Sequence, residues 1–515
     1  MSHAIETPAC LTRDNLTSDY FPSLGRTGFA ATIALCVIFF FTSIHRLNHT
    51  DLWGHLAYGR WISEHGALPH GDPFAAEAGQ AVVMQHAWLT QYLAYHWYEF
   101  AGRDGLIFAH AFLETLAAAI MMLAVARRGA RGIWPAAAGV MFVVLSLPIM
   151  GTIRPQLFAQ VGMALVFLAL SELPQKKHPL FWLPPVFAAW ANLHASTVVG
   201  LGVVGLVGAG RVFDAFQTEG KLNLSVLKTH AIALLGCVVG ACLNPHGVGA
   251  FFRAGSFGAN TAVSQISEWQ PVSPTSLTGA LLVLSAIAAV LIFRQLAERP
   301  VWWEIALLAL FAVATLLAIR MLVWWALAWS WIVIPWAARL AASFQTEKSP
   351  DEKPQAMTTV LAMGIVFTTL ILAPPTHSFL HGRTRGEATT TSPGTPYHVA
   401  DELARRKLHG AFFAPMDWSD YLVWQSHGAL QPLVYSHVHL ASPKAWEAYR
   451  QLSLGTADAL QLARENNLKY LVASRERSRE LVAAIYAGEG SRKNPLRIIY
   501  QDRKCLVAEL LPVGE

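Results

Sequence analysis

The chain is poor in charged side chains, which make up 14% of its 515 residues, whereas soluble domains carry roughly 25%. Its five cysteines have no metal-ligand or paired spacing, so the sequence predicts no structural disulfide. Residues 1–26 lack a basic start followed by an apolar region and a cleavage site, and we expect a cytoplasmic tail there. The net charge of +5 is modest, which argues against nucleic acid as a partner.

Apolar residues dominate instead. They make up 54% of the chain and gather in runs of roughly 20 residues, the length of a helix that crosses a membrane. Runs bounded by Gly, Pro and charged residues predict eleven transmembrane helices, at residues 27–47, 104–126, 133–150, 155–172, 180–194, 196–213, 229–244, 276–293, 301–319, 321–338 and 357–374. We therefore expect a polytopic α-helical membrane domain over residues 27–375.

The basic residues fall on loops of one parity between these runs. They are Arg127, Arg128 and Arg131, Lys176 and Lys177, Arg211 with Lys221 and Lys228, Arg294 with Arg299, and Arg339 with Lys348 and Lys353. By the positive-inside rule these loops face the cytoplasm. We expect a bacterial cytoplasmic (inner) membrane protein whose N-terminus is cytoplasmic and whose C-terminal segment is extracytoplasmic.

The loops of the other parity carry polar and aromatic side chains in place of solvating lysines. Their clusters are Arg154-Pro155-Gln156, Asn192-Leu193-His194, Asn244-Pro245-His246, Glu268-Trp269-Gln270 and Arg320. A chain that needed only solvation could use lysine on either side. This asymmetry predicts an active site on the outer face.

The first outer loop, residues 48–103, opens on Asp51, directly after the first apolar run. Residues 52–62 and 88–98 have helical spacing and aromatic faces, which predicts two helices lying in the membrane interface. Asp51 would then lie at the lip of a cavity roofed by these helices. Such a cavity could hold a lipid-linked substrate with its head group out of the bilayer.

The C-terminal residues 397–515 are more polar and predict a soluble α/β domain, joined by a linker at 376–396 that ends in a Thr/Ser/Gly/Pro-rich stretch. Helical spacing occurs at residues 399–407 and 445–466, and strand patterns occur at 433–435, 470–472, 497–500 and 505–508. This order predicts a small, partly parallel sheet with helices. The domain contains no Gly-rich phosphate loop.

The first outer loop resembles that of the GT-C superfamily of membrane glycosyltransferases. The matching features are an acidic residue after the first span (Asp51), a helix that carries Arg60-Trp61-Ile62, a Gly-x-x-Pro element (Gly66 to Pro69) and a polar-aromatic motif before the second span (His86 to Leu89). Protein mannosyltransferases and lipid A aminoarabinose transferases follow a similar plan, with two acids at the start. This chain has one and resembles a bacterial branch with an Asp-x-Trp-x-His-Leu loop.

The resemblance implies transfer of a sugar from a polyprenyl phosphate to a lipid, glycan or protein acceptor. The phosphate leaves as an anion, which cations and hydrogen-bond donors stabilise, while the acceptor hydroxyl needs a base. Asp51 is the candidate base. The candidates for the phosphate are Arg60, His86, Arg154 and Arg320. The candidates for sugar hydroxyls or a divalent cation are His55, Asp72, His194, Asn244, His246 and Glu268. Oxygen ligands would suit Mg²⁺ or Mn²⁺.

Structural roles explain several of these residues equally well. Asp51 has the place of a helix cap, Asp72 precedes Pro73 as a turn residue, and Arg154 and Arg320 have the places of interfacial anchors. His194, Asn244 and His246 have the places of groups that bond the last carbonyls of a helix.

Two other classes of function remain open from the sequence. A transporter or flippase of lipid-linked saccharides should place ionisable residues near the midplane of several spans, often with internal repeats. In this sequence only His110 and Glu114 are ionisable residues buried within a predicted span in this way, and no clear repeat is present. A non-catalytic assembly protein would tolerate the loss of Asp51.

Overall fold

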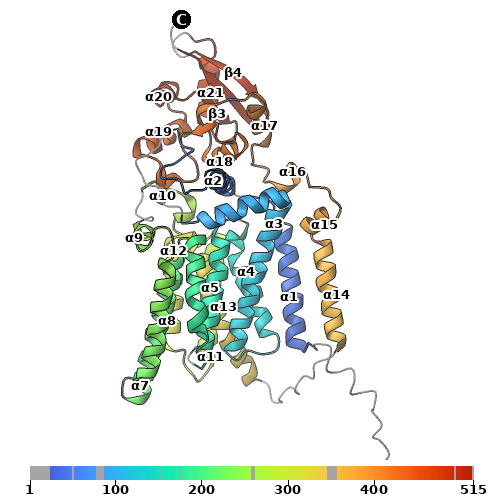
Figure 1. Ribbon diagram of the computed structural model, residues 1–515, viewed down its shortest axis with the longest axis vertical. Coiled ribbons are helices and arrows are strands. Elements are labelled where there is room, and N and C mark those ends of the chain that lie inside the picture. The colour runs from blue at the N-terminus through green and yellow to red at the C-terminus, as the bar shows by residue number, and fades with distance from the viewer. Residues whose placement is uncertain are drawn as a thin grey trace, which may run out of the picture.

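The computed structural model shows a bundle of long helices with a smaller α/β domain on one end (Figure 1). The structure describes residues 24–48, 51–76, 86–151, 153–173, 175–256, 261–344, 356–491 and 495–512. We call the end of the bundle that carries the α/β domain the domain face. The opposite end is the basic face.

Each apolar run of the sequence forms a helix of the bundle. These helices are α1 (Arg26–Ser43), α3 (Trp88–Arg127), α4 (Trp134–Met150), α5 (Gln156–Glu172), α6 (Pro179–Leu193), α7 (Thr197–Glu219), α8 (Leu224–Cys242), α11 (Leu277–Gln295), α12 (Trp302–Leu317), α13 (Leu322–Ser343) and α14 (Ala356–Leu372). Within the described residues, six helical segments are long and apolar enough to cross a membrane, or seven if α14 is counted with the helix after it. Helices α4, α5 and α12 are apolar but shorter. The protein is a multi-pass membrane protein.

Helix α13 is the centre of the bundle. Its side chains from Leu322 to Trp336 are all buried, because the helix is apolar on every side and has no face suited to water. The Trp331 ring stacks on Phe167 of α5 with centroids 4.6 Å apart. Helices α4, α5, α11 and α12 pack around α13.

Helix α3 changes direction at Gly102, whose φ of 62° is one that side-chain-bearing residues rarely adopt. The segment before this break lies across the end of the bundle, and the segment after it runs through the bundle (Figure 1). The interfacial helix and the span that the sequence predicts at 88–98 and 104–126 are therefore two arms of one bent helix.

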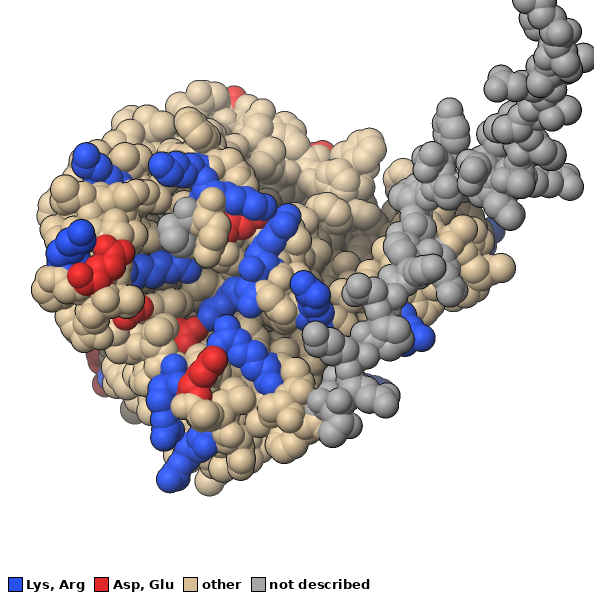
Figure 2. Space-filling model, turned by 90° about the horizontal axis from the view of Figure 1, so that it is seen from below, with Lys and Arg blue, Asp and Glu red and all other residues tan. Residues whose placement is uncertain are grey.

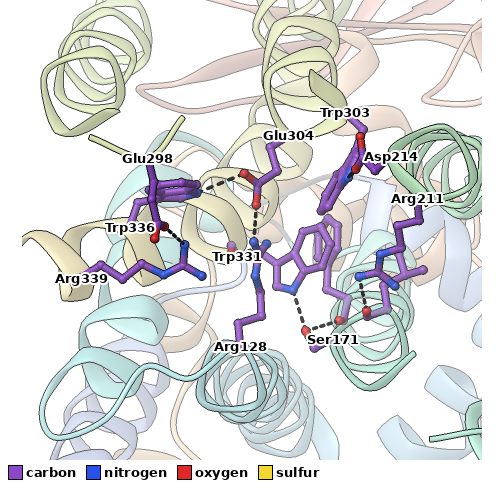
Figure 3. Close-up of polar contacts among 12 residues, drawn as sticks. Arg128, Ser171, Arg211, Asp214, Glu298, Trp303, Glu304, Trp331, Trp336 and Arg339 are labelled. Carbon is purple, nitrogen blue, oxygen red and sulfur yellow. Dashed lines mark hydrogen bonds and ion pairs between the residues drawn. The ribbon is translucent and has the colours of Figure 1, made fainter. Parts of the chain in front are cut away.

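The basic loop residues that the structure describes gather on one face, as their parity predicts, while Lys348 and Lys353 lie outside the described residues. Figure 2 shows Lys and Arg side chains spread over the end of the bundle opposite the α/β domain. Figure 3 shows how this end is held together. The guanidinium of Arg128 pairs with the carboxylate of Glu304 and lies 4.6 Å from the ring centre of Trp331, while Trp336 donates to the other oxygen of Glu304 at 3.1 Å. Arg211 donates to the carbonyl of Leu170 in α5 and to that of Leu173, directly after the helix.

The soluble domain contains a five-stranded sheet in the order β2-β1-β3-β5-β4. Strand β1 pairs in parallel with β2 and β3, whereas β5 pairs antiparallel with β3 and β4, so the sheet is partly parallel as predicted. The strands are β1 (Gly410–Phe413), β2 (Leu430–Pro432), β3 (Tyr470–Ser474), β4 (Leu496–Gln501) and β5 (Cys505–Leu510). The helices and turns of the domain are α17 (Tyr397–Arg405), α18 (Met416–Gln425), η4 (Val438–Leu440), α19 (Pro443–Leu454), α20 (Ala459–Glu465) and α21 (Arg479–Gly488).

Two predictions about this domain were wrong, and one strand was missed. Strand β1 was not predicted, because its sequence Gly-Ala-Phe-Phe is too short to alternate. Residues 433–435 do not form a strand but follow directly after β2. The helix expected over 445–466 is two helices, because the chain turns at Gly455 with a φ of 62°.

The linker is structured where it passes the domain face. It contains α15 (Pro374–Leu380) and α16 (Glu387–Thr390), and Thr391 forms a parallel bridge with Leu47, at the end of the segment that follows α1. Arg103 of α3 donates to Glu387, which also accepts from Tyr421 of the soluble domain. The linker thus ties the soluble domain to the chain just before Asp51.

Helix α2 (Asp51–His65) was expected to present its aromatic face to the membrane interface, but this face is buried within the protein. It packs against α18 of the soluble domain and against α3, and it buries Trp53, Leu56 and Tyr58. Figure 1 shows it directly beneath α18. Its aromatic face serves a contact between domains, a role that local spacing does not distinguish from lipid contact.

Candidate functional site

Asp51 is the first residue of α2, where a carboxylate is stabilised by the positive end of the helix dipole. Its Oδ2 lies 3.0 Å from Nη2 of Arg154, which stands between α4 and α5. The Asp51 side chain is 26% exposed and that of Arg154 is 13% exposed, so the ion pair is largely shielded yet within reach of solvent.

Arg154 has a second carboxylate partner. Its Nη1 donates to Oε2 of Glu268, in the short helical turn η2 (Ser267–Trp269). The next residue, Trp269, supports the neighbouring cation, because the guanidinium carbon of Arg320 lies 4.5 Å from its ring centre. Arg320 belongs to the turn η3 (Ile319–Met321), which runs directly into α13. Four charged residues from separate parts of the sequence therefore meet at the domain face.

A cavity of about 170 Å³ opens among these residues. Arg154, Arg320 and Glu268 line it together with Gln156 and Gln160. The apolar part of the lining is Pro148, Ile149, Leu157 and Ile319. The combination of an apolar wall with convergent charged groups is typical of sites that orient a ligand.

Electrostatic interactions favour the charged form of Arg154. Burial would lower the pKa of Arg154, but Asp51 and Glu268 outweigh burial and hold that pKa above its usual value. The four residues of the cluster are two cations and two carboxylates, and the charge of a third carboxylate, that of Asp420, also acts on Arg154. An anion can enter by exchanging partners on the arginines rather than by filling an unbalanced positive site.

Three histidines lie near this cluster or near one another. The rings of His86 and His246 are 5.9 Å apart, and His194 is close enough to His86, Arg154 and Arg320 that their charges act on it. Burial and these neighbours lower the pKa of His194 to about 3, with Arg320 the strongest of the neighbours. His194 is therefore neutral at physiological pH and can donate and accept hydrogen bonds.

The soluble domain contributes residues that sequence reasoning missed. The His437 ring lies 5.4 Å from that of His55, one turn after Asp51 on α2, and 5.8 Å from that of His439. Asp420 of α18 accepts from the backbone and hydroxyl of Ser436 at 3.1 and 2.7 Å. It lies so close to Gly54 that a Cβ there would stand 2.1 Å from its Oδ1. Gly54 was the only sequence signal of this close approach.

Two predicted site residues lie in the joint between domains. Arg60 donates to the carbonyl of Trp424 at 2.9 Å and covers the Trp424 ring at 3.7 Å. Both carboxylate oxygens of Asp72 accept from the Tyr435 hydroxyl at 2.9 Å, and Oδ1 also accepts from Tyr58 at 3.2 Å. These contacts give Arg60 and Asp72 an evident role in docking the soluble domain.

Asn244 organises the turn after α8. Its amide nitrogen donates to the carbonyls of Ala241 and Gly247 at 2.8 and 3.2 Å, and its Oδ1 accepts from the backbone of His246 at 2.8 Å. It therefore positions His246. Across the described ranges, no group of three or more His, Cys, Asp or Glu side chains is arranged to hold a metal ion.

No family model and no curated protein sequence matches the chain. Solved structures do match. Arabinofuranosyltransferase AftD from Mycobacteria superposes with a TM-score of 0.58 at 15% identity over 96% of this chain and 40% of AftD. Oligosaccharyltransferase AglB from Archaeoglobus fulgidus, in complex with an inhibitory peptide and a dolichol-phosphate, gives 0.55 at 11% identity over 86% of this chain and 69% of AglB. ArnT from Cupriavidus metallidurans bound to undecaprenyl phosphate gives 0.50 at 15% identity over 93% and 97% of the chains.

These neighbours are GT-C membrane glycosyltransferases. The chain has the GT-C fold. At this level of identity the likeness shows the fold alone. It confirms the GT-C fold that the resemblance of the first outer loop implies. The roles of individual side chains rest on the geometry described above.

Proposed function

We propose that this protein is an integral-membrane glycosyltransferase that moves a sugar from a polyprenyl-phosphate donor to an acceptor, with Asp51 as the general base. The observation that carries the proposal is the ion pair between Asp51 and Arg154, because Arg154 also lines the cavity together with Arg320. The fold supports it, since AglB and ArnT have been solved with dolichol-phosphate and undecaprenyl phosphate.

The two arginines suit the departing phosphate. When an acceptor oxygen attacks the sugar carbon, the bond from that carbon to the phosphate oxygen breaks and the polyprenyl phosphate gains one negative charge. Arg154 and Arg320 offer planar sets of donors that match phosphate oxygens. They are held in place before the reaction by Glu268 and Trp269, which is the preorganisation that stabilises a developing charge.

Asp51 suits the acceptor side of the same reaction. The attacking hydroxyl loses a proton, and a carboxylate within hydrogen-bond reach can accept it. On accepting the proton, Asp51 loses the negative charge that the phosphate gains. Arg154 contacts Asp51 directly and lines the cavity, so it can follow this movement of charge without leaving its position.

The acceptor would approach from the soluble domain. His55 on α2 and His437 on the soluble domain stand side by side one turn from Asp51. Imidazole rings can exchange hydrogen bonds with the hydroxyls of a glycan or a hydroxyl-bearing lipid or protein. In the orientation expected from the basic loops, the domain face is the outer face of a bacterial cytoplasmic membrane.

The test is transfer by the full chain in membranes, from a panel of undecaprenyl-phosphate-linked pentoses and hexoses. Asp51→Asn keeps the shape and the helix-capping ability of residue 51 but removes its charge and basicity. Transfer should fall by roughly 10²-fold or more while folding persists. Undecaprenyl phosphate should still bind, because Arg154 and Arg320 remain. Full transfer by Asp51→Asn would remove Asp51 from the mechanism, and loss of lipid and metal binding together would indicate a metal-ligand role for Mg²⁺ or Mn²⁺.

A further inference from the structure

A second polar hollow lies away from the cavity beside Arg154. It has a volume of about 560 Å³ and is formed by α15 and the residues that follow it. The polar side chains that line it are His377, Ser378, His381, Arg383, Thr384 and Arg385. No carboxylate is among its lining residues, so its chemistry favours an anion.

The position of α15 points to a lipid. Helix α14 stands at the edge of the bundle, packed against α1, and most of its apolar side chains are exposed (Figure 1). The chain then bends by 75° into α15, which packs against α3. Phe379 and Leu380 at the end of α15 are 68% and 60% exposed. Exposed apolar side chains at the end of a span are typical of helices that lie in the membrane interface.

Polar groups that can hold an anion accompany these apolar side chains. The rings of His377 and His381 stack with centroids 4.1 Å apart, and both side chains are exposed. Arg383 is also exposed, and in the described part of the chain no carboxylate lies within salt-bridge distance of it. Arg385 differs, because its Nε donates to Asp104 of α3 at 2.6 Å. Arg385 therefore fixes the rim of the hollow, while Arg383 and the histidines are available to a ligand.

We propose that this hollow binds the phosphate headgroup of an anionic phospholipid, with Phe379 and Leu380 against its acyl chains. The site is independent of the proposed transfer reaction, because none of its residues lines the cavity beside Arg154. Its occupant would steady the linker. Arg385 is anchored to Asp104, and two residues later Glu387 binds both Arg103 and Tyr421 of the soluble domain.

The experiment uses the full chain in nanodiscs of phosphatidylcholine with and without phosphatidylglycerol, followed by release into mild detergent and native mass spectrometry of retained lipid. Wild-type protein should retain phosphatidylglycerol in preference to phosphatidylcholine. Arg383→Gln should reduce that retention about fivefold, the effect of one cation near a lipid surface. His377→Gln/His381→Gln should reduce it further. Arg46→Gln is the matched control, because Arg46 is an exposed arginine on the same face outside the hollow, and it should retain the wild-type preference.

Equal retention by wild type and Arg383→Gln/His377→Gln/His381→Gln would overturn the proposal. So would full competition by millimolar inorganic phosphate, which would indicate a site for a soluble anion. A second measurement distinguishes the loss of lipid binding from misfolding of the variant. Hydrogen exchange of residues 383–392 should slow in phosphatidylglycerol for the wild type and for Arg46→Gln, and should be unchanged by lipid in a folded Arg383→Gln variant.

Discussion

Nη2 of Arg154 lies 3.0 Å from Oδ2 of Asp51, and these two side chains come from parts of the chain about a hundred residues apart. The pair joins the candidate base to the candidate phosphate ligand. If negative charge moves from Asp51 to the departing phosphate, it therefore remains next to the guanidinium of Arg154.

Arg154→Ala and Arg320→Ala should each weaken the binding of undecaprenyl phosphate. The expected loss is about 2–5 kcal/mol where the phosphate–arginine pair is desolvated. Lysine should restore little of the binding, because it lacks the planar set of donors. Titration of the lipid into purified protein measures the effect, with Arg46→Ala as a control at an exposed arginine. Unchanged binding in both alanine variants would reduce these arginines to structural anchors.

The stability of the folded protein should decrease in acid through His437. Burial and the neighbouring His55 lower the pKa of His437 to about 3, although Asp51 acts in the opposite direction. Below the usual histidine pKa of about 6.5, His437 is protonated in the unfolded chain but stays neutral in the folded chain. The contribution of neutral His437 to the free energy of unfolding is thus complete above about pH 6.5 and is lost as the pH falls towards 3.

His437→Gln should therefore lose less thermal stability than the wild type between pH 7.5 and 5. Melting curves of the full chain in detergent at several pH values provide the measurement. His439 and His55 face His437, and the charge of His437 also acts on His439, so the difference between the two proteins reports position 437 together with its effect on His439. If the melting temperature depends on pH in the same way in the variant and the wild type, the pKa of His437 does not change on folding.

The buried pair at the basic face should behave as a unit. Arg128→Met alone leaves Glu304 with an uncompensated charge, and the expected loss of stability is about 3–5 kcal/mol. Arg128→Met/Glu304→Leu removes both charges and should recover most of that loss. A double-mutant cycle followed by unfolding in detergent measures the coupling. Additive losses would mean that the pair does not interact.

The orientation of the chain predicts which sites a membrane-impermeant thiol reagent reaches from outside. Cysteines introduced at Gly71 and Gly394 should be labelled, and a cysteine at Gly129, in the loop between α3 and α4, should not. Gly71 and Gly394 both have space around them for a new side chain. Labelling of Gly71 and Gly394 from opposite sides would contradict the arrangement of spans.

The sequence by itself determined the membrane class, the positions of the helices and the face on which the basic loops lie. These follow from local properties, since a run of apolar residues must form a helix in lipid and the charges between runs choose a side. It also identified Asp51, Arg154, Glu268 and Arg320 as residues of one face, because loops of the same parity share a face. Their pairing within one cluster could not be derived from parity.

Only the tertiary structure decided which of these residues meet. Arg60 and Asp72 belong to the same loop as Asp51, yet they turn towards Trp424 and Tyr435 of the soluble domain. His437 and Asp420 reach the neighbourhood of Asp51 from more than 350 residues away because α18 packs against α2 at Gly54. Hydropathy and spacing report the surroundings of a residue along its own helix. Contacts between domains depend on how two complete surfaces fit, and that information is absent from any single segment.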